Sequence, residues 1–207
     1  MARYTGPTTR LSRREGQNLY LKGDRSFSNK DDFAKRPYAP GQHGKAGVRR
    51  KMSEYGMQLR EKQKTKRFYG LQEKQFHKLY QEADRMRGNT ATNFLTLLEL
   101  RFDNIVYRLG LASSRAQARQ RVSHAHFTVN GKKVNIPSIT LNAGDVIEVA
   151  EGSRDLEIFK ELVANHAVPE WLSFDADNLK GTVVRTPGRE DVDLEVQERL
   201  IVELYSR

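Results

Sequence analysis

Residues 97–149 read LLELRFDNIVYRLGLASSRAQARQRVSHAHFTVNGKKVNIPSITLNAGDVIEV, and this stretch decides the fold. Its beginning belongs to an apolar pattern at helical spacing that runs from Leu95 to Leu109. The pattern stops at Gly110, and glycine is the residue that most often closes a helix. We therefore expect one continuous helix that reaches Gly110.

A second helix and a hairpin follow in the same stretch. Ser114 and Gln117 fit a capping box, and we expect the helix that they open to reach Ser123. Asn130-Gly131 is a strong signal for a two-residue hairpin turn, here between strands over 127–129 and 134–136. The stretch therefore predicts a module of two helices and a small sheet, with its core over 97–150, in a chain of the α+β class.

Arg115 occupies an unusual place, in the first turn of the second helix. The helix macrodipole disfavours a cation there by roughly a few tenths of a kcal/mol, and an external anion would offset that cost. Arg119 follows one turn later. The two arginines favour a phosphate site, and a solvated basic face is the alternative.

The charge of the chain is strongly uneven. The 207 residues carry a net charge of +10, which favours a polyanionic partner. Residues 1–90 hold 22 Lys and Arg against 9 Asp and Glu, whereas residues 91–207 hold 14 against 17. We therefore expect the leading half to carry most of the phosphate contact, and the acidic remainder to face solvent or a basic protein.

The composition disfavours several classes of protein. Cysteine is absent, which excludes disulfides and thiolate metal sites. No apolar run approaches the length of a membrane span, and Met1-Ala2-Arg3-Tyr4 lacks the apolar core of a signal peptide. We expect a cytoplasmic protein that has no membrane partner.

The basic half begins with a polar arm. Residues 1–45 are rich in Gly, Pro, Arg, Lys, Asn and Ser, and we expect an extended basic arm with little core of its own. Such an arm is disordered when free, or it orders along an RNA surface.

A helix over 53–70 is expected next. Arg60, Lys64 and Arg67 form one stripe on it, and like charges at this spacing repel each other. An RNA backbone would act as their counter-charge. Phe68 is expected in the core, whereas Tyr55 and Tyr69 are candidates for stacking on unpaired bases.

The rest of the chain shows further elements. The first is a helix over 73–87, whose buried stripe consists of Phe76, Leu79, Tyr80, Ala83 and Met86. A helix over 155–164, a packed turn or short strand over 171–174, a segment with β-branched residues over 181–185, and a last helix capped by Asp193 follow.

Several motifs resemble those of the bacterial small-subunit ribosomal protein S4 family. Inside the module, Ser114-Arg115, Ala118-Arg119 and Val129-Asn130-Gly131 are similar to the RNA-binding module named after that family. Outside it, the matching segments are LSRREG at 11–16, PGQHG at 40–44, QLREKQK at 58–64 and LIVELYS at 200–206. The module also occurs in unrelated enzymes, whereas the outer segments are specific to the ribosomal family.

The resemblance implies a domain layout and partners. It implies a helical domain of residues 46–95 completed by 176–207, a module domain inserted over 96–175, and the arm in front. It implies binding to 16S rRNA, at a junction of several helices in the 5′ domain, early in assembly of the 30S body. It also implies a contact with ribosomal protein S5 that bears on translational accuracy and, in some bacteria, repression of the protein's own messenger RNA. Some members organise the arm with a cysteine-ligated zinc, whose ligands this chain lacks.

The candidate rRNA-binding residues are basic or polar side chains of the arm, the 53–70 helix and the module, with one glycine where the backbone can approach a phosphate. They are Arg3, Arg10, Arg13, Arg14, Gln42, His43, Gly44, Lys45, Arg49, Arg50, Lys51, Tyr55, Gln58, Arg60, Lys62, Gln63, Lys64, Lys66, Arg67, Tyr69, Ser114, Arg115, Arg119, Lys132 and Lys133.

Catalytic chemistry is not indicated. Lys51-Met52-Ser53-Glu54 is similar to a loop of tyrosyl-tRNA synthetases, but neither a nucleotide-binding domain nor a Gly-rich phosphate loop accompanies it. His124 and His126 lack the carboxylate or thiol partner that a metal site needs. We expect no enzymatic activity, no cofactor, no metal and no small-molecule substrate. An RNA-modifying enzyme with the same module and a nonspecific nucleic-acid binder are the alternatives.

Overall fold

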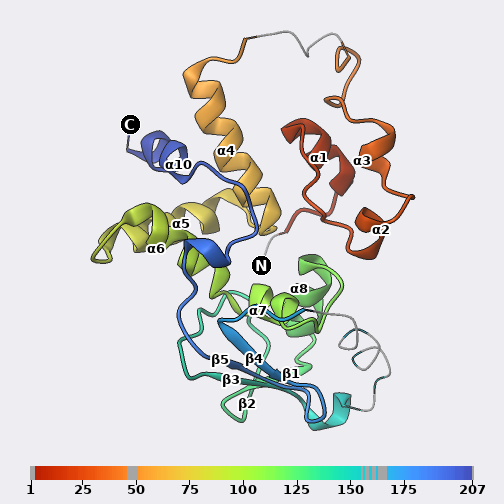
Figure 1. Cartoon of the computed structure of the whole chain (residues 1–207), viewed down its shortest axis with the longest axis vertical. Helices are drawn as coiled ribbons and strands as arrows, with labels where there is room; N and C mark the ends of the chain where they lie inside the picture. Colours follow the sequence, from red (N-terminus) through yellow and green to blue (C-terminus); the bar gives the residue numbers. More distant parts are fainter. Residues whose placement is uncertain are drawn as a thin grey trace. The chain divides into compact units, whose positions relative to one another are not determined.

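The computed structural model describes residues 3–45, 51–154, 156, 159, 162 and 167–206. The chain is a mixed helix-and-sheet protein, which confirms the predicted α+β class (Figure 1). It forms two compact units, Met1–Ala91 with Leu194–Arg207, and Thr92–Asp193. Within the described residues, no helix is both long and apolar enough to cross a bilayer.

The limits of the units differ from those that the resemblance implies. Residues 176–193 belong to the second unit, because β4 (Leu172–Asp175) and β5 (Lys180–Val183) pair as one hairpin of its sheet. Asp175 closes the turn of this hairpin, since its Oδ1 accepts hydrogen bonds from the N–H groups of Asp177 and Asn178. The chain returns to the first unit only at Leu194.

Two longer helices form the centre of the first unit, α4 (Glu54–Phe68) and α5 (Glu73–Arg85). Ser53 Oγ accepts a hydrogen bond from the Gly56 N–H at 3.2 Å, so α4 begins with a serine cap. Phe68 is buried, as predicted. The buried face of α5 consists of Phe76, Leu79, Tyr80 and Ala83, as predicted for the 73–87 helix, but Met86, which was also expected on that face, follows the end of the helix and is exposed.

The last helix, α10 (Glu198–Tyr205), packs against α4. Gln58 Nε2 of α4 donates a hydrogen bond to Glu203 Oε2 at 3.1 Å. The Tyr205 ring lies 4.7 Å from the Tyr80 ring of α5, centroid to centroid. The predicted cap of this helix is wrong, because the residue before its first turn is Gln197. Asp193 instead pairs with Arg108, and both of these residues belong to the second unit.

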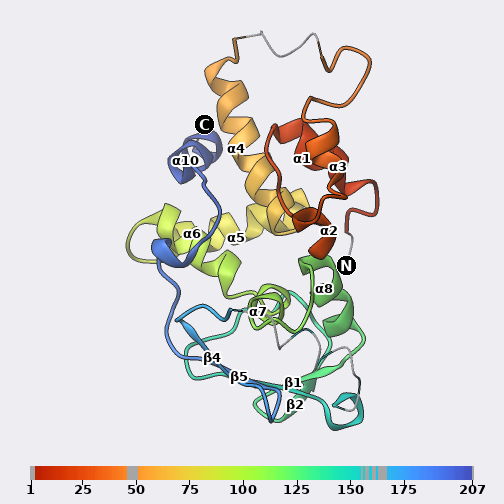
Figure 2. The same cartoon turned by 45° about the vertical axis from the view of Figure 1, so that its right-hand side comes forward.

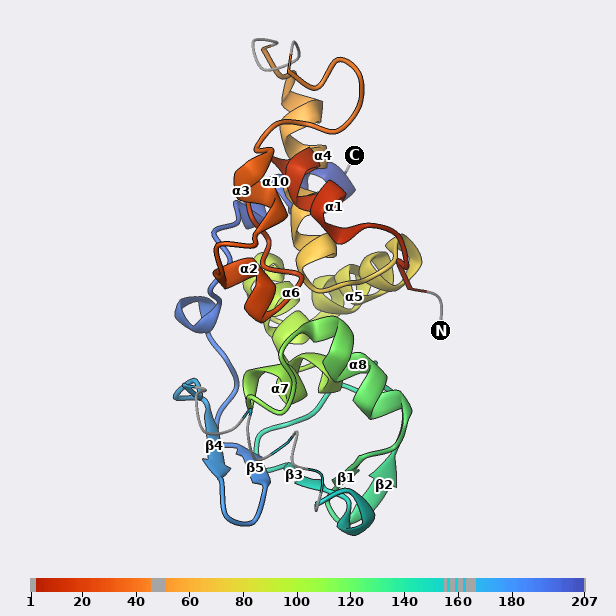
Figure 3. The ribbon, with the colours of Figure 1, turned by 90° about the vertical axis from the view of Figure 1, so that its right-hand side faces the viewer.

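The N-terminal arm contains three short helices rather than extended chain alone. They are α1 (Thr8–Glu15), α2 (Asp24–Phe27) and α3 (Asp32–Lys35), which gather beside α4 (Figure 3). Gly16 ends α1 with a φ of 69°, a left-handed conformation that favours glycine. Leu19 is buried, so the arm contributes a side chain to the core of its unit.

The second unit is built on a five-stranded antiparallel sheet in the order β2-β1-β3-β5-β4. The predicted hairpin is confirmed as β1 (Phe127–Val129) and β2 (Lys132–Val134), and β3 (Val146–Val149) lies on the other side of β1. Asn130 and Gly131 both have positive φ, 49° and 76°, as a two-residue turn of type I′ requires. This turn pairs Val129 with Lys132, so β2 begins two residues earlier than predicted.

The predicted single helix up to Gly110 is two helices, α6 (Thr90–Glu99) and α7 (Phe102–Arg108). Between them Arg101 has an extended backbone and forms an isolated bridge with Thr140. The Phe102 N–H donates to the Ile139 carbonyl at 2.8 Å. The helix is therefore interrupted because a segment about 40 residues later in the chain takes its backbone hydrogen bonds.

Helices α7 and α8 (Arg115–Ser123) cover one face of the sheet (Figure 2). The core between these helices and the sheet includes Ile105, Val106, Leu109, Ala118, Val122, Phe127, Ile147, Val149, Trp171 and Val183. A Cβ at position 181 would lie 2.5 Å from Leu109 Cδ1, so β5 needs a glycine where α7 crosses it. The predicted 155–164 helix lies mostly outside the described residues, but Phe159 is buried against Phe127.

Candidate nucleic-acid interface

The basic stripe of α4 faces carboxylates of its own unit. The pairs are Arg60 and Arg67 with Glu15, Lys62 and Lys66 with Glu73, and Lys64 with Glu61. The protein itself therefore supplies part of the counter-charge that the sequence led us to expect from RNA. Five cations share three carboxylates, so the helix retains an excess of positive charge.

Glu15, the last residue of α1, lies between two arginines of α4. Its Oε1 accepts hydrogen bonds from Arg60 Nη1 at 3.3 Å and from Arg67 Nη1, and its side chain is only 1% exposed. Burial raises the pKa of Glu15, although the two arginines act in the opposite direction. Helix α1 is thus attached to α4 through a carboxylate whose charge is unfavourable to bury.

Glu73, the first residue of α5, accepts three hydrogen bonds. Lys62 Nζ and Tyr205 OH donate to its Oε1 at 2.7 and 2.8 Å, and Lys66 Nζ donates to its Oε2 at 2.7 Å. Burial raises the pKa of Glu73, but these hydrogen bonds outweigh it and lower the pKa to about 2. This carboxylate joins α4, α5 and α10 and remains charged at neutral pH.

Five of the candidate rRNA-binding residues are buried: Gly44, Gln58, Lys62, Tyr69 and Arg119. The Tyr69 ring packs edge-on against Phe68, with 5.2 Å between the centroids, and it is 5% exposed. A Cβ at Gly44 would lie 1.9 Å from the Ala39 carbonyl oxygen. The sequence pattern does not show which of these positions a distant segment of the chain covers. We therefore expected all five residues at the surface.

The other candidates of α4 lie at or near its surface. Arg60, Gln63, Lys64, Lys66 and Arg67 are partly buried. In front of the helix, Lys51 is exposed, and Tyr55 in its first turn has 53% of its surface exposed. Tyr55 is therefore accessible for stacking on a base, whereas Tyr69 is not.

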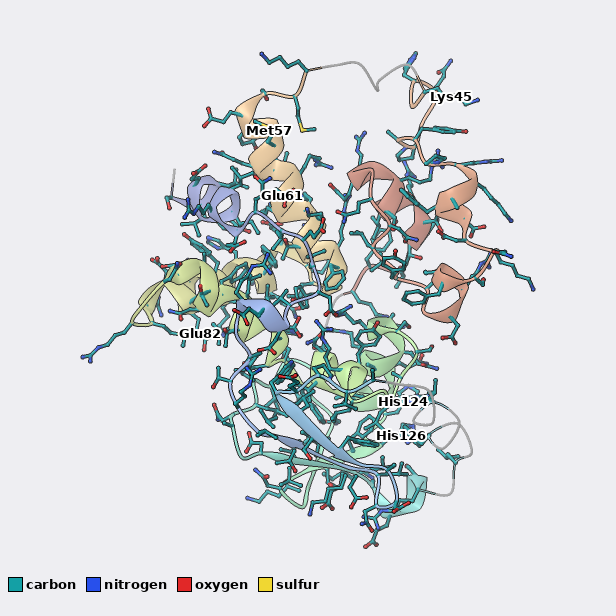
Figure 4. The ribbon with its side chains drawn as sticks, in the orientation of Figure 1. Lys45, Met57, Glu61, Glu82, His124 and His126 are labelled. Atoms are coloured by element: carbon teal, nitrogen blue, oxygen red, sulfur yellow. The ribbon has the colours of Figure 1, made fainter. Side chains whose placement is uncertain are left out.

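The arm presents exposed cations and one organising arginine. Arg3, Arg10, Arg14, Gln42, His43 and Lys45 are exposed, and Figure 4 shows Lys45 at the end of the described arm. Arg13 differs, because its Nε donates to the Tyr38 carbonyl at 2.9 Å and its guanidinium lies 4.9 Å from the Tyr38 ring centroid. It fixes the start of the loop that holds Gln42 and His43. Arg49 and Arg50 lie outside the described residues.

The start of α8 confirms the predicted cap. Ser114 Oγ accepts a hydrogen bond from the Gln117 N–H at 3.3 Å. The Gln117 side chain accepts from the Ser113 N–H at 2.7 Å, one residue before the position that a capping box would use. The helix therefore begins where the sequence places it, with Arg115 in its first turn.

The two arginines of α8 have different surroundings. Arg115 is partly buried, its Nε donates to Asn104 Oδ1 at 2.9 Å, and its guanidinium lies 4.5 Å from the Tyr107 ring centroid. Arg119 is 8% exposed and donates to Asp103 Oδ2 at 2.9 Å, a carboxylate that Arg101 also contacts. Of the two, Arg115 is the more exposed.

Lys132 and Lys133 are exposed but face opposite sides of the sheet. Lys132 pairs with Val129 and Lys133 with Thr128, and successive residues of a strand point to opposite faces. Lys132 shares its face with the buried Phe127, the side that α7 and α8 cover. Lys132 and Lys133 therefore cannot both lie on one surface with Arg115.

A stripe on α5 also presents cations that the sequence analysis did not select. Lys74, Lys78 and Arg85 are exposed at helical spacing, and His77, Gln81 and Glu82 lie along the same groove (Figure 4 labels Glu82). None of these three cations has a carboxylate within 4 Å among the residues that the structure describes. Their spacing of four and seven residues on the polar face was the signal that would have identified them.

The histidine pair shows no metal site. The His124 and His126 rings lie 6.1 Å apart, centroid to centroid (Figure 4), and His126 Nδ1 is 2.9 Å from Ser153 Oγ. Burial lowers the pKa of His126, and the positive charges of His124, Arg121 and Lys133 lower it further. In the described part of the chain, no three His, Asp or Glu side chains gather as metal ligands.

Comparison with known families and proteins gives matches along most of the chain. Residues 3–99 match the family model described as Ribosomal protein S4/S9 N-terminal domain, and residues 100–147 match the S4 domain. The Small ribosomal subunit protein uS4 of Thermoanaerobacter sp. (strain X514) is 58% identical over 208 residues, which cover 100% of both chains. The protein of the same name from Ruminiclostridium cellulolyticum is 55% identical over 210 residues, and uS4A of Alkaliphilus oremlandii is 58% identical over 209 residues, again with 100% of both chains covered.

Proposed function

This chain belongs to the family of small ribosomal subunit proteins uS4, and we propose that it binds 16S rRNA as a structural constituent of the small subunit. The family is structural and non-enzymatic. The proposed binding uses multiple phosphate contacts and the shape of the folded RNA, and it involves no catalytic step.

One observation carries this proposal. The cations of α4 outnumber the carboxylates that pair with them, five to three, although the helix lies inside a folded unit. Lys74, Lys78 and Arg85 on α5 add positive charge that no described carboxylate balances within 4 Å. A phosphate backbone relieves the mutual repulsion of such cations and releases its own counterions.

The proposed RNA-facing surface consists of exposed or partly exposed side chains only. In the arm and around α4 and α5 it comprises Arg3, Arg10, Arg14, Gln42, His43, Lys45, Lys51, Tyr55, Arg60, Gln63, Lys64, Lys66, Arg67, Lys74, Lys78 and Arg85. In the second unit it comprises Ser114, Arg115 and Lys132, whereas Lys133 is a separate contact on the opposite face of the sheet. The buried residues Gly44, Gln58, Lys62, Tyr69 and Arg119 support the fold beneath it.

Chemical footprinting of 16S rRNA with the purified chain tests the proposal. We expect the chain to protect one defined set of nucleotides at about 0.15 M salt, where screened surface charges alone act over about 8 Å. Competition with duplex DNA of equal length distinguishes a specific from a nonspecific binder, because a nonspecific binder loses its RNA to the DNA. Unchanged nucleoside composition of the RNA after prolonged incubation, which also reveals a base isomerised without change of mass, argues against an RNA-modifying enzyme. Uniform, weak protection along the whole RNA would contradict the proposal.

Family membership also supports three finer proposals. We propose that the chain binds early and helps to nucleate assembly of the 30S body, that it contacts ribosomal protein S5 with an effect on translational accuracy, and that it represses its own messenger RNA. Reconstitution of the 30S body with and without the chain tests the first role. Without the chain, we expect the proteins that join later to bind less. Cross-linking to S5 combined with misreading assays tests the second. Binding of the chain to its own transcript, with loss of translation in vitro, tests the third.

A further inference from the structure

The side chain of Arg115 is held by two residues of α7. Its Nε donates to Asn104 Oδ1 at 2.9 Å, and its guanidinium carbon lies 4.5 Å from the centroid of the Tyr107 ring. Both partners belong to α7. An arginine at a helix surface ordinarily samples many rotamers, and losing that freedom has an entropic cost, so two contacts from another helix indicate a side chain that is held in advance.

The orientation of the Asn104 amide follows from its other neighbour. Asn104 is buried, and its Nδ2 lies 2.7 Å from Glu99 Oε2 and 2.9 Å from the Glu99 carbonyl oxygen. Both of these atoms only accept hydrogen bonds, so the NH₂ group must point towards Glu99. The amide oxygen must then point the other way, where it accepts from Arg115.

Glu99 is itself fixed at this position. It is fully buried, and Arg108 donates to both of its carboxylate oxygens, from Nε to Oε2 at 3.0 Å and from Nη2 to Oε1 at 2.8 Å. Such a bidentate ion pair is directional, so it fixes the plane of the Glu99 carboxylate. The order of contacts is therefore Arg108, Glu99, Asn104 and Arg115.

The chemistry of an amide explains why asparagine suits this position. An aspartate at position 104 would accept from Arg115 but would repel Glu99 and cancel the charge of Arg115. An aliphatic side chain would contact both neighbours without a hydrogen bond. Asparagine donates on one side and accepts on the other, so it orients the guanidinium of Arg115 and leaves its positive charge intact.

We propose that Asn104 is a positioning residue for RNA binding, which orients Arg115 towards a phosphate without touching the RNA itself. This inference rests on the proposed function, because it needs Arg115 at the RNA surface. Glu99 acts one step further back, by setting the direction of the Asn104 amide. If Asn104 acts through Arg115, its substitution should affect RNA binding only while Arg115 is present. If Asn104 is merely structural, its substitution should have the same effect with and without Arg115.

A double-mutant cycle separates the two cases, with affinity for 16S rRNA measured on the full chain. We expect Arg115→Ala to weaken binding about tenfold, the effect of losing one contact of about 1.4 kcal/mol. Asn104→Ala should weaken binding at least threefold in the natural background and less than twofold when Arg115→Ala is already present. Equal losses in both backgrounds, or no loss in either, overturn the proposal.

Two further measurements keep the test decisive if Asn104→Ala folds poorly. Arg115→Lys keeps the charge at a surface position but lacks the Nε–H that Asn104 orients, and we expect it to weaken binding several-fold. Full affinity of Arg115→Lys overturns the proposal. By nuclear magnetic resonance, the Arg115 Nε–H should be protected from exchange in the natural chain, and an unprotected proton likewise contradicts the positioning.

The experiments distinguish failure of the proposed function from failure of this inference. If the natural chain protects no defined region of 16S rRNA, the proposed function is wrong. If the chain protects the RNA and Arg115→Ala binds as tightly as the natural chain, only the assignment of Arg115 and Asn104 is wrong. Gln120→Ala, an exposed residue on the same helix, is the matched control and should bind within twofold of the natural chain.

Discussion

Arg119 of α8 donates from Nη1 to Asp103 Oδ2 of α7 at 2.9 Å, and both side chains are buried. Asp103 also accepts from Arg101, whose Nη2 lies 3.1 Å from the same oxygen. A pattern of basic residues on α8 predicted a phosphate ligand at Arg119. The structure shows a side chain that joins two helices, and this changes what its substitution should do.

Arg119→Glu should destabilise the second unit and not merely weaken RNA binding. The new carboxylate would face Asp103 in a buried position, and breaking a buried pair in this way costs about 3–5 kcal/mol. Denaturant unfolding monitored by circular dichroism measures the loss. Gln120→Glu changes an exposed neighbour and should stay within about 0.5 kcal/mol of the natural chain. Equal stability of the two variants would contradict the assignment.

Glu15→Gln should leave the fold intact and strengthen RNA binding. Because burial raises the pKa of Glu15, the folded state holds the proton more tightly than the unfolded chain does, and the stability that protonation contributes is lost as the pH rises through the folded pKa. Glutamine mimics that protonated form at neutral pH, so the free energy of unfolding should not fall. Arg60 and Arg67 would also lose their shared counter-charge.

The salt dependence of binding checks the Glu15→Gln prediction. We expect the slope of log affinity against log salt concentration to steepen by roughly one unit or less, the value for about one additional phosphate contact. Glu195→Gln removes the same charge at an exposed position of the same unit and should leave the slope unchanged. A large drop in melting temperature would show instead that the ionised carboxylate is needed to hold α1 on α4.

Replacing Lys74, Lys78 and Arg85 together by alanine should weaken binding to 16S rRNA. Each lost phosphate contact should reduce the salt slope by roughly 0.7–0.9, and the melting temperature should hardly change because the three side chains are exposed. A triple alanine variant at Arg154, Lys180 and Arg185 is the control. These cations lie in the second unit and pair with carboxylates of that same unit. The stripe is a solvated helix face if both triple variants bind alike.

Glu73→Gln should flatten the loss of stability in acid. The folded-state pKa of Glu73 is about 2, below the ordinary value of 4.5, so its contribution is fully present above about pH 4.5 and lost as the pH falls towards 2. The variant should therefore be less stable at pH 7 and decline less between pH 4.5 and 2. The effect should be moderate, since the Glu73 side chain is 46% exposed. Glu82→Gln, exposed on the same helix, should behave as the natural chain does.

Local patterns in the sequence predicted most of the elements but few of their partners. The Asn130-Gly131 turn, the Ser114 cap and the apolar stripe of α5 depend on neighbours in the chain, and the structure confirms all three except for Met86 at the end of the stripe, which is exposed. The break at Arg101 depends on a bridge to Thr140, about 40 residues away, and nothing in the helical period reveals it.

The same distinction explains the candidate interface. The stripe of cations on α4 is visible in the sequence, but Glu15 pairs with Arg60 and Arg67 across 45 and 52 residues. Burial of Arg119 likewise follows from the packing of α8 on α7. The opposite directions of Lys132 and Lys133 are an exception, because a two-residue turn already fixes which face each side chain takes.

Strand β2 is one of the two outer strands of the sheet, and among the residues that the structure describes no strand pairs with the outer side of its backbone. Such an edge attracts a strand from another molecule, which leads to aggregates. Lys132 and Lys133 place a positive charge above and below this edge, so two copies of the hairpin repel each other before their backbones can pair. These two charges therefore oppose self-association of the free chain through the β2 edge.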